Sequence, residues 1–196
     1  MNYTIVGLGN PGEEYELTRH NTGRIVLSAL YKKENLSSFK LDKKLKALVS
    51  EGKIGKDKIE VIFPETFMNK SGASVAPLIK NKKQAERLIV VHDDLDLPLG
   101  TMKISFNRGS GGHKGIESII KAIKTEAFVR VRIGVSPKTI KGKAKKPKGE
   151  EKIVNFIIGK FSKLEQETLK KVSKQVAEAI ATLVKDGRER AMGEFN

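Results

Sequence analysis

The histidines of this chain are the first candidates for chemistry, because each stands among polar residues at the predicted end of a strand or helix. They occur in the segments T-R-H-N, H-D-D-L-D and G-G-H-K, as His20, His92 and His113. A carboxylate beside an imidazole holds the ring in one tautomer and makes it a general base for water or a hydroxyl. The carboxylates that could serve His20 in this way are Asp93, Asp94 and Asp96. Taken alone, however, a histidine is more often structural than catalytic.

The H-D-D-L-D segment also allows a second chemistry, because imidazole nitrogens and carboxylate oxygens are ligands for divalent cations. Such a site would suit a metal-dependent phosphohydrolase. Neighbouring residues of a strand point to opposite faces, so few of the side chains in residues 92–96 can reach one ion. We therefore expect no metal here, and turnover in a chelator separates the two hypotheses.

Two glycine-rich segments are candidate phosphate sites. The first, G-L-G-N-P-G at residues 7–12, has the spacing of dinucleotide-binding loops. Pro11 has no N–H to offer a pyrophosphate, and residues 32–34 are K-K-E where an acidic residue should close a second strand. A sharp turn that brings substrate close to Asn10 explains these glycines better. The second segment, residues 109–115, precedes a predicted helix and is either a phosphate-binding loop or a plain turn.

Several enzyme classes are excluded by what the sequence lacks. There is no cysteine, so disulfides, thiolate metal sites and cysteine nucleophiles are excluded. The motifs G-x-S-x-G, H-E-x-x-H and G-x-x-x-x-G-K-[ST] do not occur. Serine hydrolases, zincins and P-loop proteins therefore lose their main support.

The hydrophobic pattern predicts the elements that must position these residues. Short apolar and β-rich runs predict strands at residues 2–6, 46–50, 58–63, 88–92, 102–106 and 129–135. Helical periodicity predicts helices at residues 22–33, 71–81, 114–124 and from 151 onward. This alternation is typical of an α/β protein, here one domain over residues 1–196 with a mixed, mostly parallel sheet flanked by helices. Open α/β sheets place their sites in loops that follow strands.

The chain is strongly basic: 38 Lys and Arg against 23 Asp and Glu give a formal net charge of +15 over 196 residues. Such a surplus attracts polyanions and favours a nucleic-acid partner, although a generally lysine-rich composition would also produce it. Residues 137–149 hold six lysines and no acid, and predict a mobile loop with salt-dependent phosphate contacts. No leader pattern or membrane-length apolar run is present, so we expect a cytoplasmic protein with no membrane partner.

Five segments of the chain together indicate a family. They are G-L-G-N-P-G with Tyr15 and T-R-H-N, T-F-M-N with S-G, H-D-D-L-D-L-P with Gly100, G-G-H at 111–113, and G-K-F-S at 159–162. In this order and spacing they resemble the bacterial-type peptidyl-tRNA hydrolases over nearly the whole chain. The resemblance implies hydrolysis of the ester bond between a peptide and the 3′ ribose of tRNA, which recycles tRNA from stalled ribosomes. It implies neither a metal nor an organic cofactor.

The resemblance also implies roles for single residues. His20 is the general base that activates water, Asp93 hydrogen-bonds it, and Asn10 places the peptide end. The residues that line the groove for the 3′ end and the peptide are Tyr15, Phe67 and Asn69. Further candidate contacts to the substrate are His113, Lys114, Lys103 and Arg132. Ser105 stands where the family often has a lysine for a tRNA phosphate.

Lys114 replaces an asparagine that the family nearly always has, and it motivates an alternative function. A lysine there would stabilise an oxyanion or a phosphate, or it would mark a tRNA- or RNA-binding protein on the same fold that has lost catalysis. The retained His20 and Asp93 favour the hydrolase, because a decaying site should lose that pair early. No apolar heptad or spare hydrophobic edge is evident, so we expect a monomer.

Overall fold

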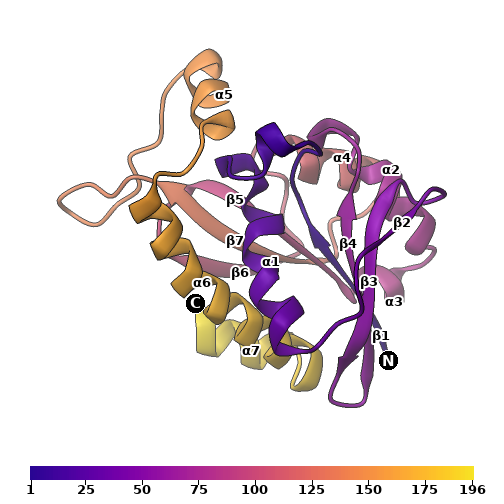
Figure 1. Ribbon diagram of the computed structural model, residues 1–196. Coiled ribbons are helices and arrows are strands. Elements are labelled where there is room, and N and C mark those ends of the chain that lie inside the picture. The colour runs from indigo at the N-terminus through magenta and orange to yellow at the C-terminus, as the bar shows by residue number, and fades with distance from the viewer.

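A seven-stranded sheet forms the centre of this computed structural model, which describes residues 1–196 (Figure 1). Its strands are β1 (Asn2–Gly7), β2 (Lys40–Asp42), β3 (Ala47–Ile54), β4 (Asp57–Pro64), β5 (Leu88–Pro98), β6 (Met102–Phe106) and β7 (Val129–Ser136). Their order in space is β2-β3-β4-β1-β5-β7-β6. The central strands β4, β1, β5 and β7 are parallel, and the outer strands pair antiparallel. The predicted α/β class with a mixed sheet is confirmed, with the parallel part at the centre.

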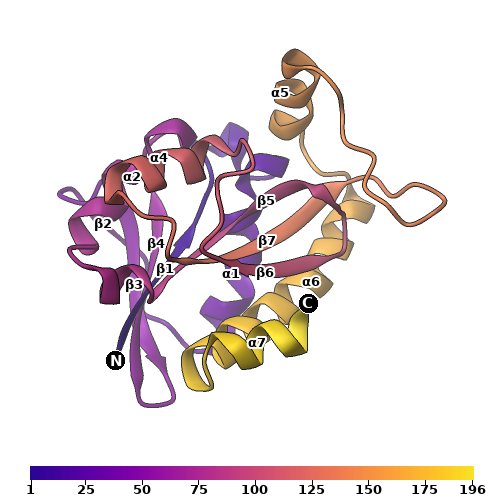
Figure 2. The same ribbon diagram turned by 180° about the vertical axis from the view of Figure 1, so that it is seen from behind.

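Helices cover both faces of the sheet. They are α1 (Thr22–Lys33), α2 (Gly72–Val75), α3 (Lys82–Ala85), α4 (Lys114–Ile123), α5 (Glu150–Ile158), α6 (Lys163–Lys185) and α7 (Arg188–Phe195). Opposite views show α1, α6 and α7 on one face and α2 and α4 on the other (Figures 1 and 2). The neighbours Ile5 and Val6 of β1 are both fully buried, one in each of the two cores, as strand alternation requires. No helix is both long enough and apolar enough to cross a bilayer.

Close packing at the start of α1 depends on a glycine. A Cβ at Gly23 would collide with the backbone oxygen of Val91 and with the backbone of Leu8. Only a residue without a side chain therefore lets the first turn of α1 rest directly on Leu8, which follows β1, and on β5 at Val91, where its pairing with β1 ends. This contact brings the residues just before α1 to the carboxyl edge of the sheet.

Two of the predicted helical regions are divided in the structure. Residues 71–81 form α2 and then the 3₁₀ turn Ala76–Leu78, because Pro77 lacks the N–H that would continue an α-helix. The region from 151 onward forms α5, α6 and α7, and α6 starts at a capping box made by Ser162 and Glu165. β5 continues past residue 92 to Pro98, and the short edge strand β2 has no counterpart among the predicted strands.

Residues 137–149 lie between β7 and α5, at the outside of the molecule (Figure 1). A bridge between Lys138 and Ala144 and a backbone hydrogen bond from Lys145 to Pro137 make this segment a narrow turn. The mobility expected from its composition stays a prediction.

Asn196 closes part of the outer edge of β6. Its Oδ1 accepts a hydrogen bond from the backbone N–H of Ile104 at 2.7 Å, and its Nδ2 donates to the oxygen of the same residue at 3.0 Å. β6 is the last strand of the sheet on this side, so one amide side chain takes the place of a neighbouring strand at Ile104.

Candidate active site

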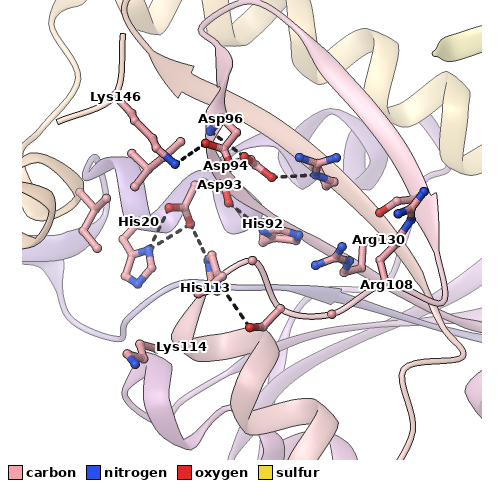
Figure 3. Close-up of a pocket in the computed structure, with 18 of the residues that line it drawn as sticks. His20, His92, Asp93, Asp94, Asp96, Arg108, His113, Lys114, Arg130 and Lys146 are labelled. Atoms are coloured by element: carbon pink, nitrogen blue, oxygen red, sulfur yellow. Dashed lines mark hydrogen bonds and ion pairs between the residues drawn. The ribbon is translucent and has the colours of Figure 1, made fainter. Parts of the chain in front are cut away.

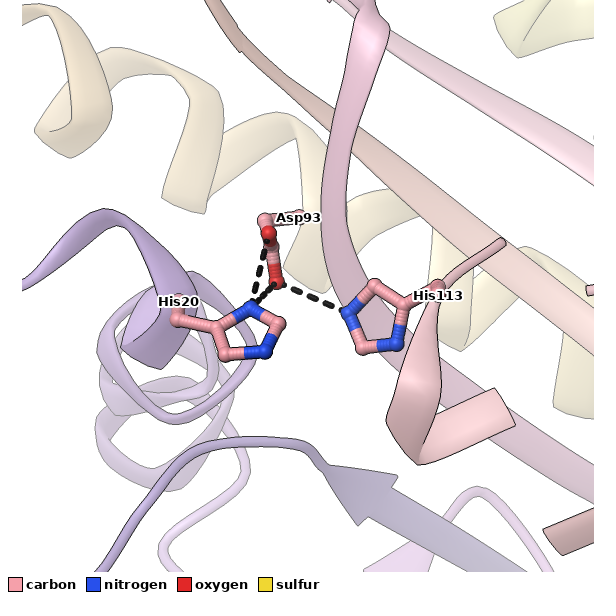
Figure 4. Close-up of side chains that lie close together, drawn as sticks. All are labelled: His20, Asp93 and His113. Atoms are coloured by element: carbon pink, nitrogen blue, oxygen red, sulfur yellow. Dashed lines mark hydrogen bonds and ion pairs between the residues drawn. The ribbon is translucent and has the colours of Figure 1, made fainter. Parts of the chain in front are cut away.

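Three residues far apart in the sequence meet at the carboxyl edge of the parallel strands (Figure 4). His20 is on the 3₁₀ turn Arg19–Asn21 between β1 and α1, Asp93 is in β5, and His113 immediately precedes α4. Because β1 and β5 are adjacent and parallel, the chain that leaves β1 lies beside the end of β5. The ring of His113 lies beside that of His20, with 4.9 Å between the ring centres, and faces the same carboxylate.

Asp93 joins the two histidines through one buried carboxylate. Nδ1 of His20 lies 3.0 Å from both Oδ1 and Oδ2 of Asp93, and Nε2 of His113 lies 2.9 Å from Oδ1. Asp93 is 3% exposed and His20 is 8% exposed, so water competes little for these hydrogen bonds. The predicted His20–Asp93 contact is present, and His113 belongs to the same cluster.

The proton of His113 is located by the helix that follows it. Nδ1 of His113 accepts hydrogen bonds from the backbone N–H groups of Gly115 and Ile116, at 3.1 and 3.4 Å, and so caps α4. A ring nitrogen that accepts from N–H groups has no proton of its own. The proton of the neutral ring is therefore on Nε2, which donates it to Asp93.

The charges of His20 and Asp93 stabilise each other. Burial opposes ionisation of Asp93, but the facing rings of His20 and His113 and their hydrogen bonds outweigh it and hold the pKa of Asp93 well below its usual value. Burial also disfavours the His20 imidazolium, but the charge and hydrogen bond of Asp93 outweigh it, so the pKa of His20 is raised. When His20 is neutral its proton is on Nδ1, toward Asp93, and Nε2 is free to accept one. This is the protonation pattern of a general base.

Ligand atoms of His20, Asp93 and His113 lie within 4.8 Å of one another, a spacing that a metal ion could use. The donor chemistry does not fit an ion. His113 would have to offer the lone pair of Nε2 and protonate Nδ1, yet Nδ1 faces two backbone N–H donors. A metal at this place would break the cap of α4, so these three residues do not fit a metal ion.

The H-D-D-L-D segment does not gather its side chains around one point either (Figure 3). Oδ2 of Asp94 accepts from Nε of Arg132 at 2.7 Å, and Oδ1 of Asp96 lies 2.6 Å from Nζ of Lys146. Asp93 turns instead toward His20. The alternation expected for a strand thus sends successive carboxylates to different partners.

His92 is fully enclosed behind this cluster. Its Nδ1 donates to the backbone oxygen of Asp93 at 2.7 Å. Burial first, and then the adjoining ring of His113, lower the pKa of His92 well below its ordinary value, so the ring is neutral. His92 therefore holds the backbone that carries the Asp93 carboxylate.

Asn10 is held in one orientation by its neighbours. Its Oδ1 accepts from the backbone N–H of Met68 at 2.8 Å. Asn21 fixes the backbone of Asn10, accepting from its N–H at 2.8 Å and donating to its oxygen at 2.9 Å. With Oδ1 occupied, the Nδ2 group is the remaining donor of Asn10, and it suits a carbonyl or a developing oxyanion. Nothing in the sequence marks Asn21 for this task except its place directly after His20.

A cavity of about 930 Å³ opens beside His20 and continues along β6 and β7 (Figure 3). Its basic lining residues include Arg108, Arg130 and Arg132. Arg130 is 6% exposed and its Nε has no hydrogen-bond partner. Burial, and then the neighbouring charge of Arg132, lower the pKa of Arg130. Carboxylates line the cavity as well, and Asp94 and Asp96 pair with Arg132 and Lys146. Apolar side chains of α5 form another part of the wall. Since Arg108 and Arg130 form no ion pair, the cavity suits a ligand that is partly anionic and partly apolar.

The remaining candidate residues lie at different places around this centre. Lys114 lines the cavity, but its side chain is 66% exposed and its Nζ lies 3.3 Å from Oε2 of Glu117. Arg132 lies inside the cavity, whereas Lys103, its neighbour across the sheet in β6, is exposed and does not line it. Arg132 and Lys103 are thus paired across adjacent strands, but only Arg132 lines the cavity.

Tyr15, Phe67 and Asn69 do not line this cavity. Tyr15 ends the 3₁₀ turn Glu13–Tyr15, shortly before His20. Phe67 is 58% exposed, and both Phe67 and Asn69 flank Met68, whose N–H binds Asn10. Phe67 and Asn69 are therefore on the Asn10 side of the site, and all three residues lie apart from the cavity.

An imidazole that binds a buried carboxylate through one nitrogen and whose ring lines a cavity is an arrangement suited to an enzyme that uses a general base. The comparison with protein families narrows this class. A family model described as "Peptidyl-tRNA hydrolase" matches residues 4–196. The chain belongs to the peptidyl-tRNA hydrolase family.

Relatives and solved structures agree over the whole chain. A peptidyl-tRNA hydrolase of Thermoanaerobacter sp. (strain X514) is 40% identical over 195 residues, covering 99% of both chains. One from Alkaliphilus oremlandii (strain OhILAs) is 38% identical, also over 99% of both. The crystal structure of the Acinetobacter baumannii peptidyl-tRNA hydrolase superposes with a TM-score of 0.87 at 31% identity, covering 99% of this chain and 94% of that one.

Proposed function

We propose that this protein hydrolyses the ester bond between peptide and tRNA in peptidyl-tRNA, with His20 as the general base. Family membership over residues 4–196 supports the reaction. The observation that supports the base is the geometry of His20, whose Nδ1 binds Asp93 while the ring lines the cavity. The tRNA released in this way becomes available for a further round of translation.

In the proposed mechanism, water binds at Nε2 of His20. Nε2 takes a proton as the water oxygen attacks the ester carbonyl carbon, and Asp93 stabilises the imidazolium that forms. Nδ2 of Asn10 donates to the oxyanion of the tetrahedral intermediate. When the intermediate collapses, the bond to the ribose oxygen breaks and that oxygen takes the proton from His20. The products are a peptide with a free carboxyl group and a tRNA with a free ribose hydroxyl.

We assign the contacts with tRNA phosphates to the basic side of the molecule. The candidate groups are Arg132, Lys103, Lys114 and the lysines of residues 137–149. The net charge of +15 supports an electrostatic contribution that positions the acceptor end and weakens with salt. Tyr15, Phe67 and Asn69 are assigned to the 3′ end and the peptide on the Asn10 side. We assign His113 to holding Asp93 and not to binding substrate directly, because the proton on its Nε2 is already donated to Asp93.

The test is release of N-acetyl amino acid from N-acetyl-aminoacyl-tRNA by wild type, His20→Ala and Lys114→Asn, with EDTA present. We expect fast release by wild type and none by His20→Ala above the uncatalysed rate. Wild-type protein as slow as His20→Ala but still binding tRNA, together with restored turnover in Lys114→Asn, would instead identify a non-catalytic RNA-binding protein. Loss of wild-type activity in EDTA would identify a metal-dependent enzyme.

We further propose that the protein is a monomer and acts in the cytoplasm. Membership in a family named for a tRNA substrate supports the second proposal, and the net charge of +15, which makes copies of the chain repel each other, supports the first. Light scattering during size-exclusion chromatography tests the first, with a mass near 21.7 kDa expected. Fractionation of cells that express the tagged chain tests the second.

A further inference from the structure

Arg19, the residue directly before His20, binds a distant part of the chain. Its Nη1 donates to the backbone oxygens of Gly159 and Lys160, at 3.1 and 3.2 Å, and its Nη2 donates to Oε1 of Glu165 at 2.9 Å. Gly159 and Lys160 lie in the junction between α5 and α6, and Glu165 lies in the first turn of α6. The side chain of Arg19 is 13% exposed and that of Glu165 is 25% exposed, so this ion pair is partly shielded from water.

The surroundings of this side chain require an arginine. The guanidinium lies over the rings of Phe156, in α5, and Phe161, in the junction, at 4.5 and 5.1 Å from the ring centres. A planar fork can stack on aromatic rings and donate to several oxygens at once, whereas a lysine ammonium is a compact charge that cannot do both. The junction is therefore matched to Arg19 by shape as well as by charge.

The backbone around Arg19 is tied to the same junction. Its own N–H donates to the oxygen of Gly159 at 3.1 Å, and the N–H of Phe161 donates to the oxygen of Leu17 at 2.9 Å. Side chain and backbone together hold the 3₁₀ turn Arg19–Asn21, and with it His20, against the end of α5. A shift of that end must move the turn or break these hydrogen bonds.

α5 forms part of the cavity wall but contributes no buried residue to the core. None of its residues is buried, although Ile153, Val154 and Ile157 line the cavity. In the ribbon view the helix stands away from the sheet, and residues 137–149 lead into its first turn (Figure 1). A helix with few buried contacts is positioned by its ends, and the carboxyl end of α5 is where Arg19 binds.

We propose that Arg19 is a positioning residue that couples the placement of α5 over the cavity to the alignment of His20 with Asp93. Substrate that fills the cavity and packs against α5 then favours the geometry in which Nδ1 of His20 meets both oxygens of Asp93. The proposal rests on the proposed function, because it concerns the base which that function uses. Arg19 itself touches no reacting atom.

The test uses Arg19→Gln and Arg19→Lys, with kcat and KM measured separately on N-acetyl-aminoacyl-tRNA. A displacement of a catalytic group by about 1 Å costs on the order of 100-fold in rate, so we expect kcat of Arg19→Gln to fall by about tenfold or more. KM should change by less than about threefold, because the tRNA contacts remain. Arg19→Lys keeps the charge opposite Glu165 and should recover part of the loss.

A second variant approaches the same contact from the side of α5. A Cβ at Gly159 would lie 3.1 Å from Nη1 of Arg19 and 3.1 Å from the backbone oxygen of Phe156, so Gly159→Ala should displace the guanidinium or the end of α5 and lower kcat in the same direction, by less. The control is Arg188→Gln in α7, which removes an arginine that lies 3.6 Å over the ring of Phe106. The control should leave kcat within about twofold of wild type.

Nuclear magnetic resonance of the His20 ring in the substrate-free protein supplies a readout that a purely structural role would not move. In Arg19→Gln we expect the measured pKa of His20 to fall toward its ordinary value as the contact with Asp93 loosens. The proposal is overturned if kcat stays within about twofold in folded Arg19→Gln and Gly159→Ala. It is also overturned if kcat falls only in step with the melting temperature while the His20 ring is unchanged. Inactive wild type would refute the proposed function, but the ring measurement would still test the coupling.

Discussion

Replacement of Asp93 by asparagine tests the role of His20 directly, because the surrounding contacts determine how the new amide must orient. His113 donates from Nε2 to Oδ1 and cannot reverse its ring protons while Nδ1 caps α4. The asparagine oxygen therefore takes the Oδ1 position, and its NH₂ group takes the Oδ2 position, 3.0 Å from Nδ1 of His20. Oδ1 also lies 3.0 Å from Nδ1 of His20, so the amide offers this nitrogen an acceptor and a donor at the same distance, and the proton is no longer held on Nδ1 as the carboxylate holds it. The tautomer with the proton on Nε2 then becomes accessible, and Nε2 is the nitrogen that must accept a proton from water.

The expected fall in kcat follows from the loss of the general base in a site that keeps its shape. A positioned general base contributes about 10²- to 10⁴-fold, so we expect kcat of Asp93→Asn to fall by about 10³-fold. The charge of Asp93 also raises the pKa of His20. Activity needs neutral His20 and rises as the pH increases through that raised pKa. In Asp93→Asn the acidic limb of the remaining activity should therefore move to lower pH.

The assay is single-turnover release of N-acetyl amino acid from N-acetyl-aminoacyl-tRNA over a range of pH. The matched control is Asp94→Asn, the same chemical change at the next residue, whose carboxylate binds Arg132 and no histidine. Its loss of kcat should be far smaller. Either of two results would refute the reasoning: an Asp93→Asn variant within about tenfold of wild type, or an inactive variant in which resonance spectra still place the His20 proton on Nδ1.

Further predictions concern stability and binding. Gly23→Ala should lower the free energy of unfolding by about 3 kcal/mol or more, because its Cβ meets the backbone of Val91, and urea denaturation would measure the loss. Ser162→Ala removes the capping box of α6 and should cost about 1 kcal/mol in the same experiment; an unchanged midpoint would contradict this role. Because the pKa of Asp93 is depressed in the folded state, its contribution to stability is present above the pKa of an unfolded aspartate and is lost as the pH falls toward the folded value; wild type should lose stability on acidification more steeply than Asp93→Asn. Replacement of all six lysines in residues 137–149 by glutamine should weaken tRNA binding and reduce the slope of log Kd against log salt, and equal slopes would show that the segment makes no phosphate contacts.

The pairing of His20 with Asp93 could be predicted because it follows from the strand pattern. Two adjacent parallel strands bring the residues at and after their carboxyl ends to one edge, and strand periodicity locates those ends in the sequence. Which of the three carboxylates serves His20 could not be decided in this way from the residues alone. The choice depends on the face of β5 on which each side chain lies, and on the cations that hold Asp94 and Asp96.

The contacts that support His20 and Asp93 could not be predicted, because they form between segments that are distant in the sequence and meet only when the elements pack. The sequence places His113 before a helix, but the direction of its ring depends on how α4 sits on the sheet. Arg19 meets the oxygen of Gly159 across a sequence separation of 140 residues, and no local pattern signals such a contact. Pro77 explains why the helix predicted for residues 71–81 is divided. Where the α-helical part ends and the 3₁₀ turn begins could not be read from the sequence.

The amide of Asn196 on β6 has a consequence for how the protein behaves when it is concentrated. An uncovered edge strand is a template on which a second chain can add a strand, and such addition is a common first step of aggregation. At Ile104 both backbone groups are already occupied, and the opposite edge of the sheet is β2, which has only three residues and begins with a lysine. Loss of the Asn196 amide would therefore open this edge at Ile104 and favour the association of chains in concentrated solutions.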